Sequence, residues 1–156
     1  MASPIKIEWG SNERVGRDGF VPYSDLVAST RLLDDADEIY SSHHLQKQEY
    51  PAEELREMVG FCKAGATIEL RLPHWLGMLA RAPGNRWVLS ELQLRRWCEE
   101  IGGLNVVAIV YIPWMEQMVD AKRTFPLLTE EQIMRFVPGV VSEVRYTIEV
   151  KQAHGR

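Results

Sequence analysis

The chain is poor in cysteine and has no long apolar run. Cys62 and Cys98 have no CxxC spacing and lie on separate predicted helices, which is typical of small buried hydrophobes in a reducing compartment. No stretch approaches the roughly 20 apolar residues that a membrane-spanning helix needs, and the N-terminus has neither an apolar run nor a basic start. We therefore expect a cytoplasmic protein with no membrane segment.

Excess charge and familiar catalytic motifs are also missing. The chain has 18 Lys and Arg against 22 Asp and Glu, a net charge of −4, so its overall field does not recruit nucleic acid. There is no P-loop, nucleophile elbow or Ser-His-Asp context. Beside His43 and His44 no third ligand stands at metal-binding spacing, so no metal site is predicted.

What is present is an ordinary globular composition, 46% apolar and 26% charged over 156 residues. No repeat, low-complexity tract or linker divides the chain, so we expect one domain over 1–156 with an ordered core at about 5–151. Apolar periodicity predicts an α/β fold. The expected strands are 5–9, 20–22, 39–40, 67–72, 104–112 and 140–151, and the expected helices are 51–62, 90–101 and 129–137.

Residues 37–75 form the central unit, a strand, a helix and a second strand. Pro51 suits the first helical turn, and Glu53 and Glu54 favour the positive helix start. A parallel pair joined by such a helix crosses over right-handed, and ligands bind beyond the carboxyl ends of its strands. The residues expected along that rim are Ser42, His43, His44, Pro73, His74 and Trp75.

The same stretch carries a resemblance. "DEIYSSHHLQ" and "EELREMVGFCKAGATIELRLPHW" are similar in register to four pieces of class I S-adenosylmethionine (SAM)-dependent methyltransferases: "DEIYxSHVLEH", "LREW", "LKPGG" and a strand closing on "VPH". "IKIEWGSNERVGRDGFVPYSD" follows the outline "LNLGCGSNKxPGFxNVD" of small members, and "PGVVSEVRYTIEV" resembles their closing strand. The resemblance implies a Rossmann-like, mostly parallel sheet flanked by helices, with a shortened N-terminal half and an antiparallel C-terminal edge strand.

The resemblance also implies a function, methyl transfer from SAM to an unknown small-molecule or protein acceptor. His43 is the catalytic candidate, because a neutral histidine can move a proton near pH 7. The implied cofactor contacts are Gly10, Ser11, Asn12, Asp25 and Ser42. The segment 75–88 covers the substrate in the family, and the implied substrate contacts are His74, Trp75 and Arg86.

The cofactor motif departs from the family at its centre. Glu8 and Trp9 replace the first glycine and its neighbour, and the position of the ribose-binding acid falls near Tyr23 or Ser24, with Asp25 the nearest substitute. Side chains at glycine positions occupy ligand space, and a buried Glu beside a ligand carboxylate is unfavourable unless paired. An active methyltransferase, an inactive binding or assembly module that has lost SAM, and an unrelated α/β binding domain all remain open. Whether Trp9 fills the space around Gly10 distinguishes the first two.

Further expectations concern local structure and packing. The apolar run 104–112 predicts a strand buried on both faces, whereas the alternation over 140–151 predicts one wet face, as at an antiparallel edge. Residues 114–125 are expected to be irregular, with a short helical turn at Met115, Met118 and Val119 as the alternative. The helix after Thr129 should turn Ile133, Phe136 and Val137 inward. Strands 5–9 and 67–72 place charges on one face, so that face should be thinly covered. We expect it to be wet or to meet a second copy or a protein partner.

Overall fold

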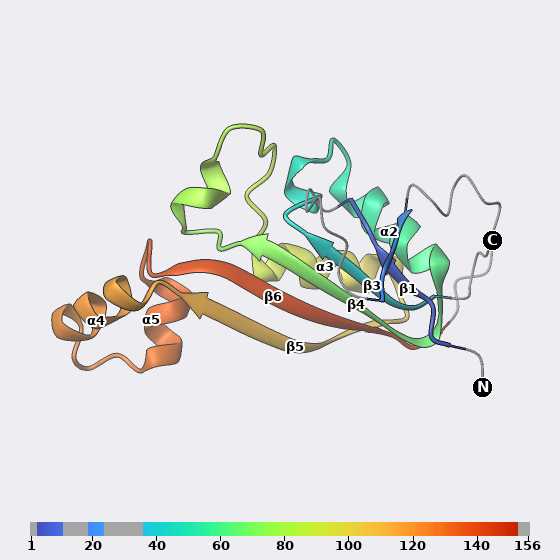
Figure 1. Cartoon of the computed structure of the whole chain (residues 1–156). Coiled ribbons are helices and arrows are strands. Elements are labelled where there is room, and N and C mark those ends of the chain that lie inside the picture. The colour runs from blue at the N-terminus through green and yellow to red at the C-terminus, as the bar shows by residue number, and fades with distance from the viewer. Residues whose placement is uncertain (1–2, 11–18, 24–35, 153–156) are drawn as a thin grey trace.

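The computed structural model describes residues 3–10, 19–23 and 36–152 (Figure 1). Its strands form one six-stranded sheet in the order β2-β1-β3-β4-β6-β5. The strands are β1 (Lys6–Glu8), β2 (Val21–Pro22), β3 (Ala36–Ser42), β4 (Cys62–Pro73), β5 (Leu104–Pro113) and β6 (Val141–Val150). The helices are η1 (Leu45–Lys47), α2 (Pro51–Phe61), η2 (Met78–Arg81), α3 (Glu91–Ile101), α4 (Met115–Thr124) and α5 (Glu130–Phe136).

The direction of the strands confirms the predicted α/β class. β2, β1, β3 and β4 are parallel neighbours, and β6 runs antiparallel between β4 and β5. The C-terminal strand is therefore antiparallel, as expected, but β5 and not β6 is the outermost strand. The sequence of β6 alternates because helices cover one face of this strand while its other face is partly solvated. β6 itself has a paired strand on each side.

Helices α2 and α3 form where the sequence predicts them. Pro51 lies in the first turn of α2. At α3 the Ser90 hydroxyl accepts a hydrogen bond from the Gln93 amide, and Gly102, at φ 80°, follows the last turn. The predicted stop of α2 at 63–65 is instead the beginning of β4, because Cys62 is already extended.

Both helices pack against the same face of the sheet, behind it in Figure 1. The strand side of this core comes from alternate positions, which share a face because successive strand side chains point in opposite directions. The central buried residues are Ile7, Ile39, Ile68, Leu70, Val144, Tyr146, Ile148, Leu55, Met58, Leu94 and Trp97. A second small core of Met118, Ala121, Ile133 and Val140 holds α4 and α5 together beyond the end of the sheet.

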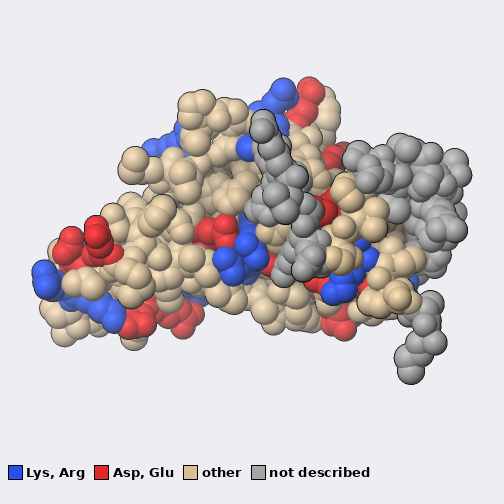
Figure 2. Space-filling view, viewed as in Figure 1, with Lys and Arg blue, Asp and Glu red and all other residues tan. Residues whose placement is uncertain are grey.

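The opposite face carries paired charges. Lys6 Nζ lies 2.9 Å from Glu38 Oε2, and Arg71 donates to Glu69 at 3.2 Å with its guanidinium 5.0 Å from the centre of the Tyr40 ring. Acidic and basic side chains lie next to one another on the face turned to the viewer in Figure 2. The predicted charged face therefore exists, and most of its charges are neutralised within the sheet.

Three packing expectations are wrong. β5 is not buried on both faces, since Val107 and Val110 are about half exposed on the outermost strand. Residues 115–124 form the regular helix α4. Phe136 is exposed, because α5 is short and only Ile133 is fully buried in it. An apolar run does not reveal whether a strand lies inside a sheet or at its edge. None of the described helices has the length and apolar character to cross a membrane.

Candidate functional site

Two consecutive histidines follow β3 at the rim where the parallel strands end. The backbone turns between them, and His43 adopts φ 52°, the only positive φ of a non-glycine residue in the described chain. His43 reaches a carboxylate of β6 on the charged face, and His44 reaches one of α2 on the helix side. Each histidine therefore belongs to a separate cluster.

His44 is held by two side chains. Its Nε2 lies 2.8 Å from Glu54 Oε1, and Gln48 Nε2 lies 3.2 Å from its Nδ1. Both bonds are satisfied by the neutral tautomer, in which Nε2 donates and Nδ1 accepts. The same Glu54 oxygen accepts a hydrogen bond from Trp9 Nε1 at 2.7 Å. The cluster ties β1, the segment after β3 and α2 together.

The Trp9 indole lies in the core, only 1% exposed. It stacks on Tyr23 with ring centres 3.8 Å apart and meets Phe61 edge-on at 5.4 Å. Tyr23 in turn donates to Glu57. The sequence resemblance assigns Trp9 to the glycine motif and Tyr23 to the neighbourhood of the ribose-binding acid, so the stack joins two positions that the resemblance expects at the cofactor.

Gly10 is the one glycine that this sequence shares with the glycine motif of the resembled family. The His44 ring packs directly against it. A Cβ atom on Gly10 would lie 2.3 Å from Cε1 and Nδ1 of His44, and Gly10 has φ 61°. The absence of a side chain thus makes room for a protein imidazole. Glu8, just before it, is also buried.

His43 forms the second cluster, with Glu143 of β6. His43 Nε2 lies 2.9 Å from Glu143 Oε2, and Arg145 donates to Glu143 Oε1 at 2.7 Å. The hydrogen bond from His43, opposed by partial burial and aided by Arg145, lowers the pKa of Glu143 to about 2. His43 Nε2 therefore faces a firmly ionised carboxylate.

His74 lies at the end of β4 and is fully buried. Its Nδ1 accepts a hydrogen bond from the Leu76 amide at 3.2 Å, and its ring stacks on Trp75 with centres 4.1 Å apart. Burial lowers the pKa of His74 to about 4, against a smaller opposite effect of the Met134 backbone. Its Nε2 has no hydrogen-bond partner among the described residues. His74 is thus neutral at pH 7 and packed inside the protein.

The segment 75–88 docks on the residues after β3. The amides of Arg86 and Trp87 both donate to the Gln46 carbonyl, at 2.8 and 3.0 Å, and Trp87 Nε1 donates to the Gln48 carbonyl at 2.9 Å. The Arg86 guanidinium is exposed and lies 3.8 Å from Glu49. The segment therefore lies beside the rim, as a cover would, with Arg86 turned to solvent.

The structure brings Gly10, Ser42, His43 and His44 to one end of the sheet. Ser42 is buried at the last position of β3. Ser11, Asn12 and Asp25, the other expected cofactor contacts, lie outside the described residues. No group of His, Cys, Asp and Glu that could hold a metal ion occurs in the described part of the chain.

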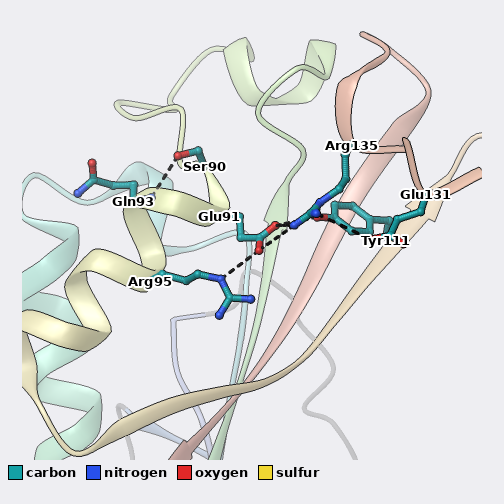
Figure 3. Close-up of polar contacts among 7 residues, drawn as sticks. All are labelled: Ser90, Glu91, Gln93, Arg95, Tyr111, Glu131 and Arg135. Carbon is teal, nitrogen blue, oxygen red and sulfur yellow. Dashed lines mark hydrogen bonds and ion pairs between the residues drawn. The ribbon is translucent and has the colours of Figure 1, made fainter. Parts of the chain in front are cut away.

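Sequence reasoning missed the partners Glu54 and Glu143, and it missed a third cluster on the helix side (Figure 3). Glu91 of α3 accepts hydrogen bonds from Tyr111 of β5 and Arg135 of α5, at 2.8 and 3.0 Å, and from Arg95 at 3.0 Å. Burial alone would raise the pKa of Glu91, but the bonds from Arg135, Tyr111 and Arg95 together lower it. This cluster fixes α5 to the body of the protein. Only contacts between distant segments reveal it.

Comparison with solved structures identifies the fold. A SAM-dependent methyltransferase from Archaeoglobus fulgidus superposes with a TM-score of 0.60 at 14% identity over 83% of this chain and 66% of that one. One from Mesorhizobium loti gives 0.57 at 13% identity, over 95% and 81%. A putative methyltransferase of Haloferax volcanii in complex with its Trm112 activator gives 0.53 at 19% identity, over 88% and 64%.

These likenesses define the class: the chain has the fold of the class I SAM-dependent methyltransferases. It spans 66% of the length of the Archaeoglobus protein and 64% of the Haloferax chain. No family model matches the sequence, and no curated protein matches it. The resemblance seen in residues 37–75 is therefore confirmed at the level of the fold.

Proposed function

We propose that this protein is a methyltransferase-like binding module that has lost SAM, with its own side chains in the cofactor's place. The observation that carries the proposal is the His44 ring packed on Gly10, where a Cβ would lie 2.3 Å from the imidazole. A glycine in such a motif serves to let a ligand approach the backbone. Here the approaching group belongs to the protein.

The closed arrangement resists reopening. A ligand at Gly10 must displace the His44 imidazole and so break its bonds to Glu54 and Gln48. Each such bond contributes about 1 kcal/mol net, so displacement weakens binding by roughly 2 kcal/mol, or about 30-fold. Trp9 adds to this, because its stack with Tyr23 and its bond to Glu54 hold β1 and α2 together.

A binding module that holds no cofactor can act by binding a protein partner. The Haloferax neighbour is in a complex with an activator protein, so this fold supports assembly with a second chain. The chain has exposed apolar side chains near the rim and on the α4–α5 pair, among them Met78, Leu79, Met115 and Phe136. Such surface is typical of interaction sites.

The test is titration calorimetry with SAM and with S-adenosylhomocysteine, up to millimolar ligand. We expect no saturable heat from the folded wild-type protein. Saturable binding tighter than millimolar would overturn the proposal, and its loss in Gly10→Arg would locate the site at Gly10. Circular dichroism establishes that both proteins are folded.

A second function, methyl transfer, has one observation in its favour. His43 takes a strained backbone conformation and is oriented by the ionised Glu143, as a general base is. Its Nδ1 would take the proton of an acceptor hydroxyl or amine while the methyl group moves from the sulfonium. If this function holds, S-adenosylhomocysteine is released from SAM in the presence of an acceptor. His43→Gln should then lower that rate by about 10²-fold or more.

A further inference from the structure

Strand β5 leaves an unguarded edge on the sheet. It is the outermost strand, spans Leu104–Pro113 and reads LNVVAIVYIP, with no charged residue and no proline before its last position. Edge strands expose unpaired N–H and C=O groups, and proteins normally protect them with charges, prolines or short length. The protection present in β5 consists of two irregularities in its pairing, a bulge beside Val107 and a register shift between Ile112 and Pro113 at the end of the strand.

Two apolar side chains of this strand are also exposed to solvent. Val107 and Val110 are 50% and 51% exposed. A hollow of about 260 Å³ runs along Val106–Ile109, bounded by Glu91 and Arg95 of α3 and by Glu131 and Arg135 of α5. Figure 3 shows Arg135 of α5 and Tyr111 of β5 reaching Glu91 of α3. β5 therefore borders open space at Val106–Ile109 and exposes the Val110 side chain.

The other edge of the sheet is different. β2 has two residues and ends at Pro22, which has no N–H to donate. Of the two edges in the described sheet, only β5 can pair over many residues. Association through a single edge stops at two chains, whereas association through two edges would produce a filament.

We propose that two copies of this chain pair through β5, antiparallel about a two-fold axis, and join their sheets into one. Identical strands paired antiparallel are two-fold symmetric, so the same surface serves both partners. The exposed valines then meet equivalent apolar side chains, and no like charges oppose each other because the strand has none. A second copy thus satisfies the backbone groups and covers the apolar side chains together. The inference is independent of whether SAM binds.

The test is the molar mass of the full chain by sedimentation equilibrium or light scattering at 1–100 µM, a range of roughly two decades chosen for μM affinity. We expect the molar mass of wild type to rise with concentration to twice the chain mass of 17.9 kDa. Val110→Lys should be monomeric, because it places two charges in the paired region. Val119→Lys is the matched control: Val119 of α4 is 46% exposed and lies off the edge, so this variant should remain dimeric.

A second measurement does not depend on a variant. Hydrogen exchange of the β5 amides in wild type should slow several-fold as protein concentration rises through the dimer dissociation constant. The amides of α4 should not change. A wild-type monomer at 100 µM, a dimer of Val110→Lys with unchanged affinity, or exchange in β5 that is independent of concentration would each overturn the proposal. Capture of a different chain by a monomeric protein would also overturn it.

Discussion

One row across the sheet carries isoleucine on four neighbouring strands, and the adjacent row carries mostly polar side chains. The first row is Ile7, Ile39, Ile68 and Ile148, and the second is Glu8, Tyr40, Glu69 and Thr147. α2 and α3 cover the first row, so its residues are at most 1% exposed. The second row lies among the ion pairs of the other face. The same strands thus build one face by apolar burial and the other by neutralised charge.

The two histidines repeat this contrast. His44 turns to the helix side and belongs to a partly buried network with Trp9 and Glu54, while the more exposed His43 lies beside Glu143 and Arg145. The helix side has used the space at Gly10 for packing.

The largest difference in the free energy of unfolding should separate substitutions at two adjacent residues of β6, Ile148 and Thr147. Ile148→Ala removes a fully buried side chain and should lower the free energy of unfolding by about 2–5 kcal/mol. Thr147→Ala, on the charged face, should change it by less than about 0.5 kcal/mol. Urea unfolding of both variants measures the difference, and similar losses would show that the two faces are not energetically distinct.

The next largest effect on stability should come from substitution of Gly10, where the His44 ring packs. Gly10→Ala forces a side chain into φ 61°, which costs about 1–2 kcal/mol, and displaces the His44 ring. Its matched control is Gly60→Ala in α2, where a Cβ meets nothing within 4 Å, and this should stabilise by up to about 1 kcal/mol. Thermal unfolding of the two variants should therefore shift in opposite directions. Unchanged stability of Gly10→Ala would mean that His44 does not occupy the glycine.

Acid should affect the two faces in separate pH windows. The pKa of His74 is lowered from about 6.5 to about 4, so the unfolded state binds the extra proton and stability falls between pH 6.5 and 4. The pKa of Glu143 is lowered from 4.5 to about 2, so the stability it contributes above pH 4.5 is lost as pH falls towards 2. Its partial exposure limits this loss to roughly 1–2 kcal/mol.

Glu143→Gln separates the two windows. The variant should keep the loss between pH 6.5 and 4 and show a flatter curve below pH 4.5, measured by urea unfolding at a series of pH values. A parallel displacement of the whole curve would argue that the His43–Glu143 bond is not the source of the lowered pKa.

The smallest effect concerns the surface ion pair of the charged face. Lys6 and Glu38 are partly exposed, so a double-mutant cycle to alanine should give a coupling energy of about 0.2–1 kcal/mol, falling with added salt. A coupling above about 2 kcal/mol, insensitive to salt, would mean that this face is effectively buried.

The sequence alone determined the class of the fold and most of its elements. Local signals were sufficient for α2, α3 and the helix after Thr129, because helix caps and apolar periodicity act within a few residues. The alternation in β4 and β6 also placed the charges on one face correctly, since strand geometry alone fixes which positions share a side. The departures at Glu8 and Trp9 were visible from the motif.

Only the tertiary structure decided what those positions do. Glu143 lies 100 residues from His43 and becomes its partner because β4 and β6 pair. The His44 ring reaches Gly10 because β1 and β3 are adjacent and α2 supplies Glu54. The apolar run of β5 became an edge instead of a core strand because β6 inserts between it and β4. Residues far apart in sequence set each of these environments, and no local pattern encodes which strands will be neighbours.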